Sequence, residues 1–253
     1  MTEIRGIYTL WLREVKRYIR DRVRIVSGLI TPMLWLLIFG SVVRFSGELG
    51  NLTYQQYLLP GIMGQALMFT SMFVSVSVIW DREFGFMKEI LVAPISRVSI
   101  FVGKMFGDST DALIQGTIVL VVGAVLGITS NFIGLIGALP VMVLITFGFV
   151  GLGVVIASFI KNLESYGVIA TLVNLPLFFL SGALFPIHGS TVPEWLQVAS
   201  MFNPLTYGID ALRIAMLGEA WQPLHPLYFD LFIMVIFDVI MIAVGTVTLS
   251  RRK

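Results

Sequence analysis

The chain has 253 residues, of which 57% are hydrophobic and 13% charged, and its formal net charge is +2. Because soluble domains carry about 25% charged residues, this composition excludes an ordinary soluble protein and predicts an all-α integral membrane protein. The chain has no cysteine, which excludes disulfides and thiolate metal sites, and the small net charge gives no reason to expect a nucleic-acid partner.

Residues 1–22 are expected to form an amphipathic helix that lies in the membrane interface. Apolar side chains recur there at steps of three and four residues, and lysines and arginines occupy the positions between them. An ordinary solvated helix end is the alternative interpretation of this pattern. Because this charged stretch precedes the first apolar run and no small-residue cleavage site follows that run, we do not expect a cleavable signal peptide.

Six apolar segments approach or exceed the length of about 20 residues that crosses a bilayer, so six transmembrane helices are expected. They are placed at about residues 23–43, 57–79, 98–128, 132–160, 166–187 and 227–249. Pro32 and Pro140 lie inside two of these segments, where a membrane helix tolerates a kink. The chain is uncharged between Asp111 and Lys161, so the third and fourth helices are expected to form a tight hairpin. Together the segments predict a single transmembrane domain over residues 1–253.

An even number of spans places both termini on the same side of the membrane, and the basic residues decide which side. All but Arg44 and Arg213 of the 17 lysines and arginines lie in segments on the side of the termini. Because cytoplasmic loops of membrane proteins are enriched in lysine and arginine, both termini are expected in the cytoplasm. The connection over residues 188–226 is then expected outside.

Between the second and third spans, residues 80–97 carry six charged side chains, although residues 49–80 carry none. Because six charges are too costly to bury in hydrocarbon, the segment is expected to lie on the cytoplasmic surface. It is expected to form a short helix that ends at Pro94. An apolar face on such a helix suits the cleft of a partner protein. That face would be formed by Phe84, Met87, Ile90 and Leu91. A solvated connecting loop is the alternative, but a linker requires neither this face nor this length.

The long connection over residues 188–226 is expected to contain two short helices. One is predicted at residues 194–202. Asn203 and Pro204 are a favourable N-cap and first-turn pair for the second, and Gly218 is a suitable stop. These helices are too short to span a membrane, so we expect them to re-enter the outer leaflet. A surface loop is the alternative, but the aromatic residues of the connection favour the interface.

Several ionisable or polar side chains fall in apolar surroundings, where such groups are costly and often functional. Those inside the predicted spans are Asp108, Asp111, Gln115 and Asp238. The first three share one face of the third span, with Lys104 one turn before them, and packing contacts or an ion pair would explain them as well as transport would. Asp238 is expected to face the bundle interior, as a hydrogen-bond partner or as part of a proton relay. On the second external helix, Asp210 and Arg213 are spaced to form an ion pair.

No motif for catalysis or for metal binding is recognised. The nearest fragment to a phosphate-binding loop, Gly103-Lys104-Met105, lacks both the upstream glycine and the hydroxyl residue. The two histidines, His188 and His225, do not have the spacing of a metal-ligand motif. We therefore expect no enzyme activity, no metal site and no ATP binding by this chain.

Two longer motifs resemble a known family. They are "REFGFMKEILVAPISR" at residues 82–97 and "FLSGALFPI…VPEWLQ…FNPLTYGIDALR" within residues 179–213. With the basic N-terminal helix and the six spans, they resemble the membrane subunits of ABC-2 type exporters, in the branch of the daunorubicin-exporter and nodulation-factor-exporter permeases. The resemblance covers essentially the whole chain.

The resemblance implies a permease that pairs with a second copy or a paralogue and engages a separate cytoplasmic ATPase dimer. ATP and Mg²⁺ would be held by that ATPase, and no cofactor by this chain. The segment 80–97 would be the coupling helix, with contacts from Arg82, Glu83, Phe84, Gly85, Met87, Glu89, Ile90, Leu91, Pro94 and Arg97. The external helical hairpin would cap the translocation path through Pro186, Pro193, Asn203, Pro204, Tyr207, Asp210 and Arg213.

The implied function is ATP-driven export of an amphipathic or lipid-like substrate, such as a drug, a lipid-linked glycan or a lipo-oligosaccharide. The permease would lie in a prokaryotic plasma membrane, in contact with the lipid bilayer. Export of a drug would confer drug resistance. A proton-coupled secondary transporter that uses Asp108, Asp111 and Asp238 is the alternative. The sequence has no convincing internal repeat, which such transporters often show. A membrane scaffold without transport is a third possibility.

Overall fold

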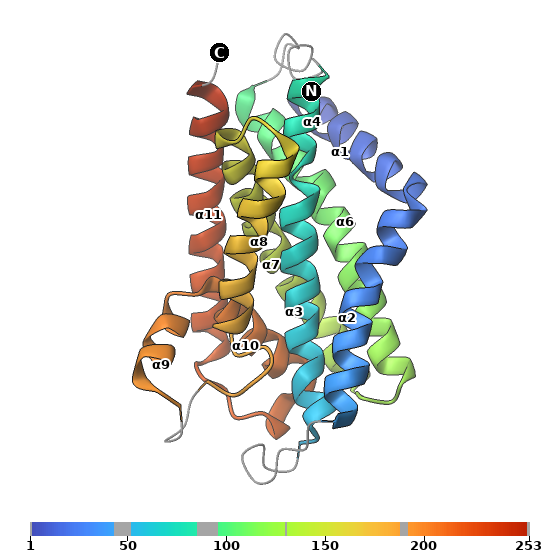
Figure 1. Cartoon of the computed structure of the whole chain (residues 1–253), viewed down its shortest axis with the longest axis vertical. Helices are drawn as coiled ribbons and strands as arrows, with labels where there is room; N and C mark the ends of the chain where they lie inside the picture. The colour runs from blue at the N-terminus through green and yellow to red at the C-terminus, as the bar shows by residue number, and fades with distance from the viewer. Residues whose placement is uncertain (1, 43–51, 85–95, 130, 188–191, 252–253) are drawn as a thin grey trace.

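A computed structural model describes residues 2–42, 52–84, 96–129, 131–187 and 192–251. Over these ranges the secondary structure is helical, without a strand, and the long helices lie side by side in one bundle (Figure 1). The all-α prediction is confirmed for these residues. The helices are α1 (Thr2–Arg20), α2 (Arg22–Val42), α3 (Tyr54–Val74), α4 (Ser77–Glu83), α6 (Arg97–Val125), α7 (Phe132–Phe159), α8 (Leu163–Phe179), α9 (Glu194–Met201), α10 (Pro204–Leu217) and α11 (Leu227–Arg251).

Within the described ranges, four helical stretches are long and apolar enough to cross a membrane. They are Tyr54–Asp81, Val98–Val125, Ile133–Phe159 and Leu227–Thr248. The pair α1 and α2, bent by 72°, makes five if it is counted as one span, and α8 is a shorter apolar helix. The prediction of a multi-pass membrane protein is confirmed, whereas the exact number of six spans is not.

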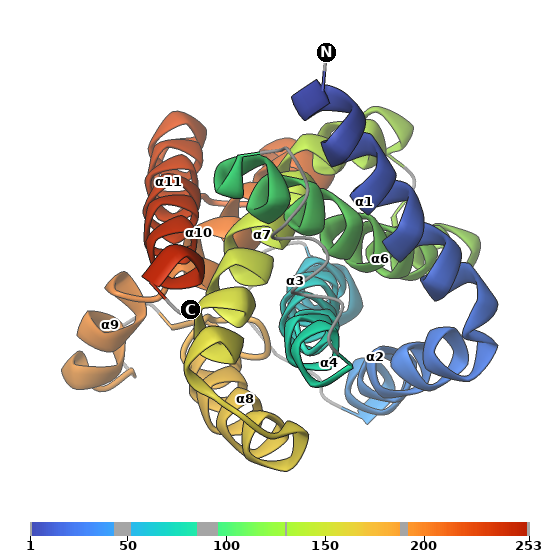
Figure 2. The ribbon, with the colours of Figure 1, turned by 90° about the horizontal axis from the view of Figure 1, so that it is seen from above.

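The first helix packs closely along the beginning of α6, near the end of the bundle where α1 begins and α11 ends (Figure 2). Glycines of α6 make this close approach possible. A Cβ atom at Gly107 would lie 2.6 Å from the Cβ atom of Glu14, and one at Gly103 would lie 3.1 Å from the Cα atom of Ile7. The apolar side chains that α1 leaves exposed include Ile4, Tyr8 and Ile19. This exposed apolar side suits a helix that lies against lipid.

The centre of the bundle is α3, which is surrounded by α2, α6, α7, α8 and α10 (Figure 2). The helix begins at a capping box, in which the side chains of Thr53 and Gln56 bond each other's backbone N–H groups. Most of its side chains are buried. Gly61 has no room for a Cβ atom beside the carbonyl oxygen of Ala183, so a glycine allows the chain after α8 to approach the axis of the bundle.

Within the predicted fifth span, residues 166–187, helix α8 ends at Phe179. Ser181 and Gly182 turn the chain there. The hydroxyl of Ser181 donates to the Phe178 carbonyl and accepts from the Ala183 N–H, and Gly182 has a φ of 74°, a conformation that favours glycine. The residues after the turn remain apolar, so hydropathy alone extended the span past the helix end.

Two α-helices, α9 and α10, lie in the described part of the connection between α8 and α11, as the sequence predicts. The side chain of Asn203 caps α10 by accepting from the Leu205 N–H, Pro204 is its first residue, and Gly218 with a φ of 57° ends it. Ten of its 14 residues are buried, among α3, α7 and α11. Helix α10 is therefore inserted into one end of the bundle, opposite the end where α1 begins (Figure 1).

Candidate functional site

Arg213 of α10 is 2% exposed and joins three parts of the bundle. Its guanidinium donates to the Gly182 carbonyl at 2.8 Å, in the turn after α8, and to the Tyr57 carbonyl of α3 at 3.4 Å. The guanidinium carbon also lies 3.8 Å from the centre of the Tyr57 ring and 4.9 Å from that of Trp221. Burial lowers the pKa of Arg213, while Tyr57 and Asp210 oppose that shift. The cation is thus held by carbonyl oxygens and aromatic faces.

Asp210 does not form the predicted ion pair with Arg213. Its carboxylate accepts from the indole N–H of Trp221 at 2.7 Å and from the backbone N–H groups of Leu224 and His225 at 2.8 and 3.2 Å. The chain after α10 folds back over the helix and supplies these three donors. These three N–H groups take the place of Arg213, so the carboxylate holds the following loop and does not form the ion pair expected from the i,i+3 spacing.

The other predicted residues of the external hairpin are placed as follows. Asn203 also donates to the Leu177 carbonyl at 2.6 Å, which ties the start of α10 to α8. The Tyr207 hydroxyl donates to a carbonyl at the end of α9 at 2.7 Å. Pro186 is half-buried in the chain after α8, and Pro193 is exposed just before α9. These side chains of α10 and its cap therefore tie the helix to α8 and α9, whereas Pro186 and Pro193 lie in the chain before it.

At the opposite end of the bundle, buried charges link three helices. The Lys104 ammonium of α6 lies 2.7 Å from Asp81 of α4 and 3.6 Å from Glu14 of α1. Arg13 bridges the same two carboxylates at 2.9 and 2.6 Å, and Arg17 lies 3.8 Å from Glu14. The Lys104, Asp81 and Glu14 side chains are almost fully buried. We call Arg13, Glu14, Asp81 and Lys104 the ionic cluster.

The ionic cluster was not found from the sequence, which offered Asp108 as the partner of Lys104. Asp108 accepts from the Ser77 hydroxyl at 3.3 Å. Burial would raise the pKa of Glu14, but the neighbouring Lys104 and Arg13 cations outweigh it and hold that pKa below its ordinary value. One signal was available: Asp81 is the first charge after a long uncharged stretch.

The structure describes only the ends of the predicted coupling segment. Arg82 and Glu83 end α4, Phe84 follows with 71% of its surface exposed, and Arg97 begins α6. A cleft of about 280 Å³ opens here, lined by Arg13, Arg17, Trp80, Asp81 and Phe84. The remaining predicted contact residues lie outside the described residues: Gly85, Met87, Glu89, Ile90, Leu91 and Pro94. The coupling assignment therefore stays a prediction.

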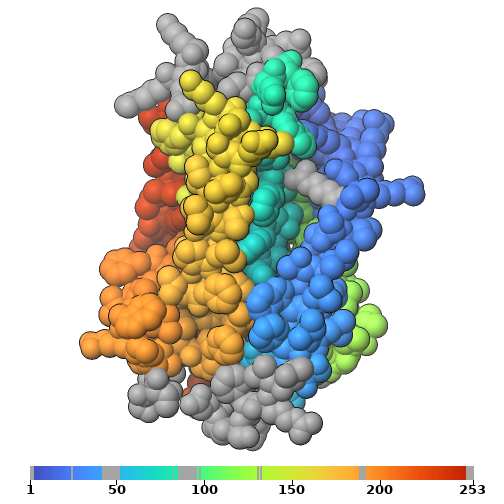
Figure 3. All heavy atoms as spheres, viewed as in Figure 1, coloured from blue at the N-terminus to red at the C-terminus, as the bar shows by residue number. Residues whose placement is uncertain are grey.

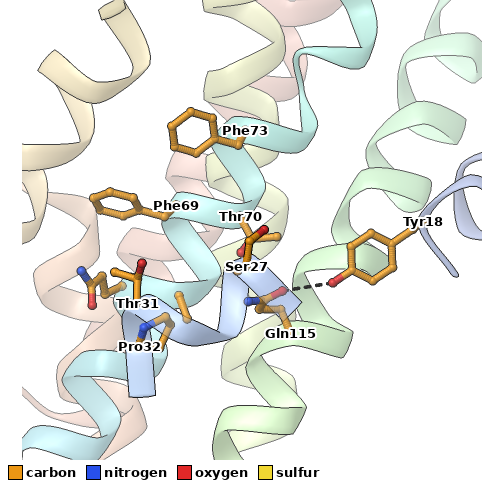
Figure 4. A pocket seen from close by; sticks show the side chains of 11 residues that line it. Tyr18, Ser27, Thr31, Pro32, Phe69, Thr70, Phe73 and Gln115 are labelled. Carbon is orange, nitrogen blue, oxygen red and sulfur yellow. Dashed lines mark hydrogen bonds between the residues drawn. The ribbon is translucent and has the colours of Figure 1, made fainter. Parts of the chain in front are cut away.

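A larger cavity of about 330 Å³ lies between α2, α3 and α6. Figure 4 shows Tyr18 and Gln115 at one side of it, joined by a hydrogen bond of 3.0 Å, with Phe69 and Phe73 projecting from α3. Its walls combine apolar and polar groups from Tyr18, Ser27, Gly28, Thr31, Pro32, Gln65, Ala66, Phe69, Thr70, Phe73 and Gln115. A few polar groups in a mostly apolar wall suit a ligand with both kinds of surface.

The remaining polar residues predicted inside spans are buried. Asp111 lies on α6 together with Asp108, and Asp238 lies on α11 and is 8% exposed. The Oδ1 atom of Asp238 would be 2.6 Å from a Cβ atom at Gly148 of α7. Asp238 therefore faces the bundle, as expected, and among the described residues this Oδ1 atom has no hydrogen-bond donor. The three aspartates come from two different helices.

Comparison with known proteins agrees with this architecture. The model of the ABC-2 type transporter family matches residues 5–217. The transport permease ycf38 of Cyanophora paradoxa is 33% identical over 94% of this chain and 86% of its own length. Nodulation protein J of Rhizobium leguminosarum bv. viciae is 29% identical over 90% of this chain and 87% of its own length. The multidrug ABC transporter permease YbhR of Escherichia coli (strain K12) is 30% identical over 70% of this chain and 49% of its own length. The chain belongs to the ABC-2 type transporter family and is an ABC transporter permease.

Proposed function

We propose that this permease exports an amphipathic or lipid-like substrate at the expense of ATP hydrolysed by a separate subunit. The observation that carries the substrate class is the 330 Å³ cavity, whose wall combines the Phe69 and Phe73 rings with the Gln65 and Gln115 amides. Apolar rings would hold a hydrocarbon part, and amides and hydroxyls would orient a polar head. Relatives named as a nodulation protein and as a multidrug permease support this class.

The ATPase is proposed to dock on residues 80–97 at the cytoplasmic side of a prokaryotic plasma membrane. The ionic cluster supports this role, because it ties α1, α4 and α6 together beside the segment. Displacement of the segment by the ATPase would then move these three helices together. The distribution of lysine and arginine supports cytoplasmic termini. The chain itself would bind neither ATP nor Mg²⁺.

Pairing with a second copy or a paralogue is proposed to complete the translocation path. Figure 3 shows α2 and α8 on one face of the molecule, with α3 between them. Both helices expose large apolar side chains on the described surface. They include Ile30, Leu34, Leu37 and Ile38 of α2 and Val168, Leu172, Leu175 and Phe179 of α8. The network around Arg213 is proposed to close the outer end of the path.

Reconstitution into liposomes tests the proposal. The permease and its ATPase should together move a fluorescent lipid or lipophilic dye when ATP is added, and the permease alone should not. An ATPase that binds but does not hydrolyse ATP is the matched control. Transport that is driven by a pH gradient without the ATPase, and is abolished by a protonophore, would instead favour a proton-coupled transporter that uses Asp108, Asp111 and Asp238.

A further inference from the structure

Three potential metal ligands from different segments converge at the α10 end of the bundle. They are Asp210 of α10, His225 of the following loop and Asp230 of the first turn of α11. One ligand atom from each residue lies within 4.8 Å of the others, and both aspartates are buried. The sequence predicted no metal site, because neither histidine has the spacing of a metal-ligand motif, and these three residues are separated along the chain.

Asp230 is the independent observation that points to a ligand. The residue is 0% exposed, and among the described residues neither oxygen of its carboxylate has a hydrogen-bond donor. The Nδ1 atom of His225 faces it at 3.6 Å, which is longer than a hydrogen bond. This nitrogen also has no hydrogen-bond partner in the part of the chain that the structure describes. Burial of a carboxylate without compensation is costly, so a positive group between these atoms would relieve the cost.

The other two ligands are held in place by their surroundings. The three N–H groups that bond Asp210 occupy three of its roughly four lone-pair directions and leave one free. The His225 ring packs against two aromatic rings, with centroid distances of 5.4 Å to Tyr207 and 5.2 Å to Phe229. Both groups are therefore positioned before any ligand arrives, which lowers the cost of binding.

We propose that Asp210, His225 and Asp230 bind one divalent transition-metal cation, with Zn²⁺ and Mn²⁺ the best matches to the donor set. Two carboxylates balance the charge of such an ion, and the imidazole nitrogen favours it over Mg²⁺ or Ca²⁺, which prefer oxygen ligands. Ligands on a tetrahedral Zn²⁺ at about 2.0–2.1 Å stand about 3.4 Å apart, close to the 3.6 Å between His225 and Asp230. Water would complete the coordination.

The bound ion would fasten α10 and its loop to α11. Arg213, three residues after Asp210, already fastens α10 to α3 and to the turn after α8. The ion would add a polar attachment between α10 and α11, which already pack against each other. The site would therefore stabilise the α10 end of the bundle, and its occupancy would be independent of nucleotide and of the transported substrate.

The test uses the full chain, purified in detergent through a tag that contains no histidine and freed of metal with a chelator. Zn²⁺ and Mn²⁺ should each raise the thermal unfolding midpoint, and Co²⁺ should bind with a stoichiometry of one and give a ligand-field absorption band that Zn²⁺ displaces. Asp230→Asn and His225→Gln should each weaken Co²⁺ binding at least 10-fold. His188→Gln, which changes the other histidine of the chain, should bind as the unchanged protein does.

Two results would overturn the proposal. One is that neither Zn²⁺ nor Mn²⁺ changes the unfolding midpoint of the wild-type protein. If Asp230→Asn then raises that midpoint, the carboxyl groups of Asp210 and Asp230 share a proton in place of a metal ion. The other is Co²⁺ binding that His188→Gln weakens and His225→Gln does not. If Asp230→Asn fails to fold, the half-exposed His225→Gln variant and the stoichiometry of the unchanged protein still decide the question.

Discussion

The Nζ atom of Lys104 lies 2.7 Å from Oδ2 of Asp81, and this contact joins the helices at the two ends of the predicted coupling segment. Asp81 belongs to α4, whose last residues begin the segment, and Lys104 belongs to α6, which starts at the end of the segment. Glu14 of α1 adds a second carboxylate beside the same ammonium group. A partner that displaces the segment would therefore also move α1, α4 and α6.

Replacing Lys104 with Met should destabilise the protein by about 3–5 kcal/mol, because loss of one partner leaves buried charges uncompensated. The double variant Lys104→Met with Asp81→Leu should recover part of this loss. Thermal unfolding of the purified variants in detergent measures both effects. An unfolding midpoint that Lys104→Met leaves unchanged would mean that water, and not Lys104, satisfies the carboxylates.

Replacing Gly107 with Val should displace α1 from α6, because even a Cβ atom would lie 2.6 Å from the Cβ atom of Glu14. Overpacking of this kind costs about 1–3 kcal/mol. Gly167→Val is the matched control, since a Cβ atom at Gly167 of α8 would meet no atom within 4 Å. The unfolding midpoint should fall for Gly107→Val only. Equal effects of the two changes would argue against the close packing of α1.

Met87→Asp should abolish docking of the ATPase if residues 80–97 form the coupling helix, because a charge in a dry cleft is strongly unfavourable. Glu89→Lys should weaken docking less than Met87→Asp does. Its effect should be larger at low salt than at high salt, as expected of a charged contact at the rim of an interface. Co-purification of the ATPase at two salt concentrations measures both. Docking of Met87→Asp at the wild-type level would reduce the segment to a connector.

Arg213→Lys should destabilise the protein by about 2–4 kcal/mol, because an ammonium group cannot reproduce the forked hydrogen bonds and the stacking of a guanidinium. Tyr57→Phe is a milder change, since it removes the hydroxyl that donates to the Gly182 carbonyl and keeps the ring below Arg213. Its expected cost is about 1 kcal/mol. Denaturant titration should rank the two variants in this order. A larger loss of stability for Tyr57→Phe would mean that the tyrosine hydroxyl, and not Arg213, makes the main attachment to the turn after α8.

The predicted orientation can be tested with single cysteines, because the chain has none of its own. A cysteine at Ser190 should react with an impermeant thiol reagent added to intact cells. A cysteine at Ser96, which is exposed just before α6, should react only after the membrane is permeabilised. The reverse pattern would invert the topology and place the coupling segment outside.

The sequence by itself determined the helical membrane architecture, since a chain this apolar can satisfy its backbone in hydrocarbon only through internal hydrogen bonds. Local signals also sufficed for the start and end of α10, because Asn203, Pro204 and Gly218 act through the backbone of their immediate neighbours. The two long motifs sufficed for the family.

Only the tertiary structure decided which distant side chains meet. Lys104 has Asp108 one turn away on its own helix, yet its closest carboxylate, Asp81, comes from α4. Asp210 has Arg213 at the right helical spacing, yet the loop after α10 reaches its carboxylate first. The end of α8 was likewise hidden, because apolar residues continue through the turn at Gly182. Hydropathy and spacing report local preferences, whereas these contacts depend on how whole helices pack, which no short stretch of sequence encodes.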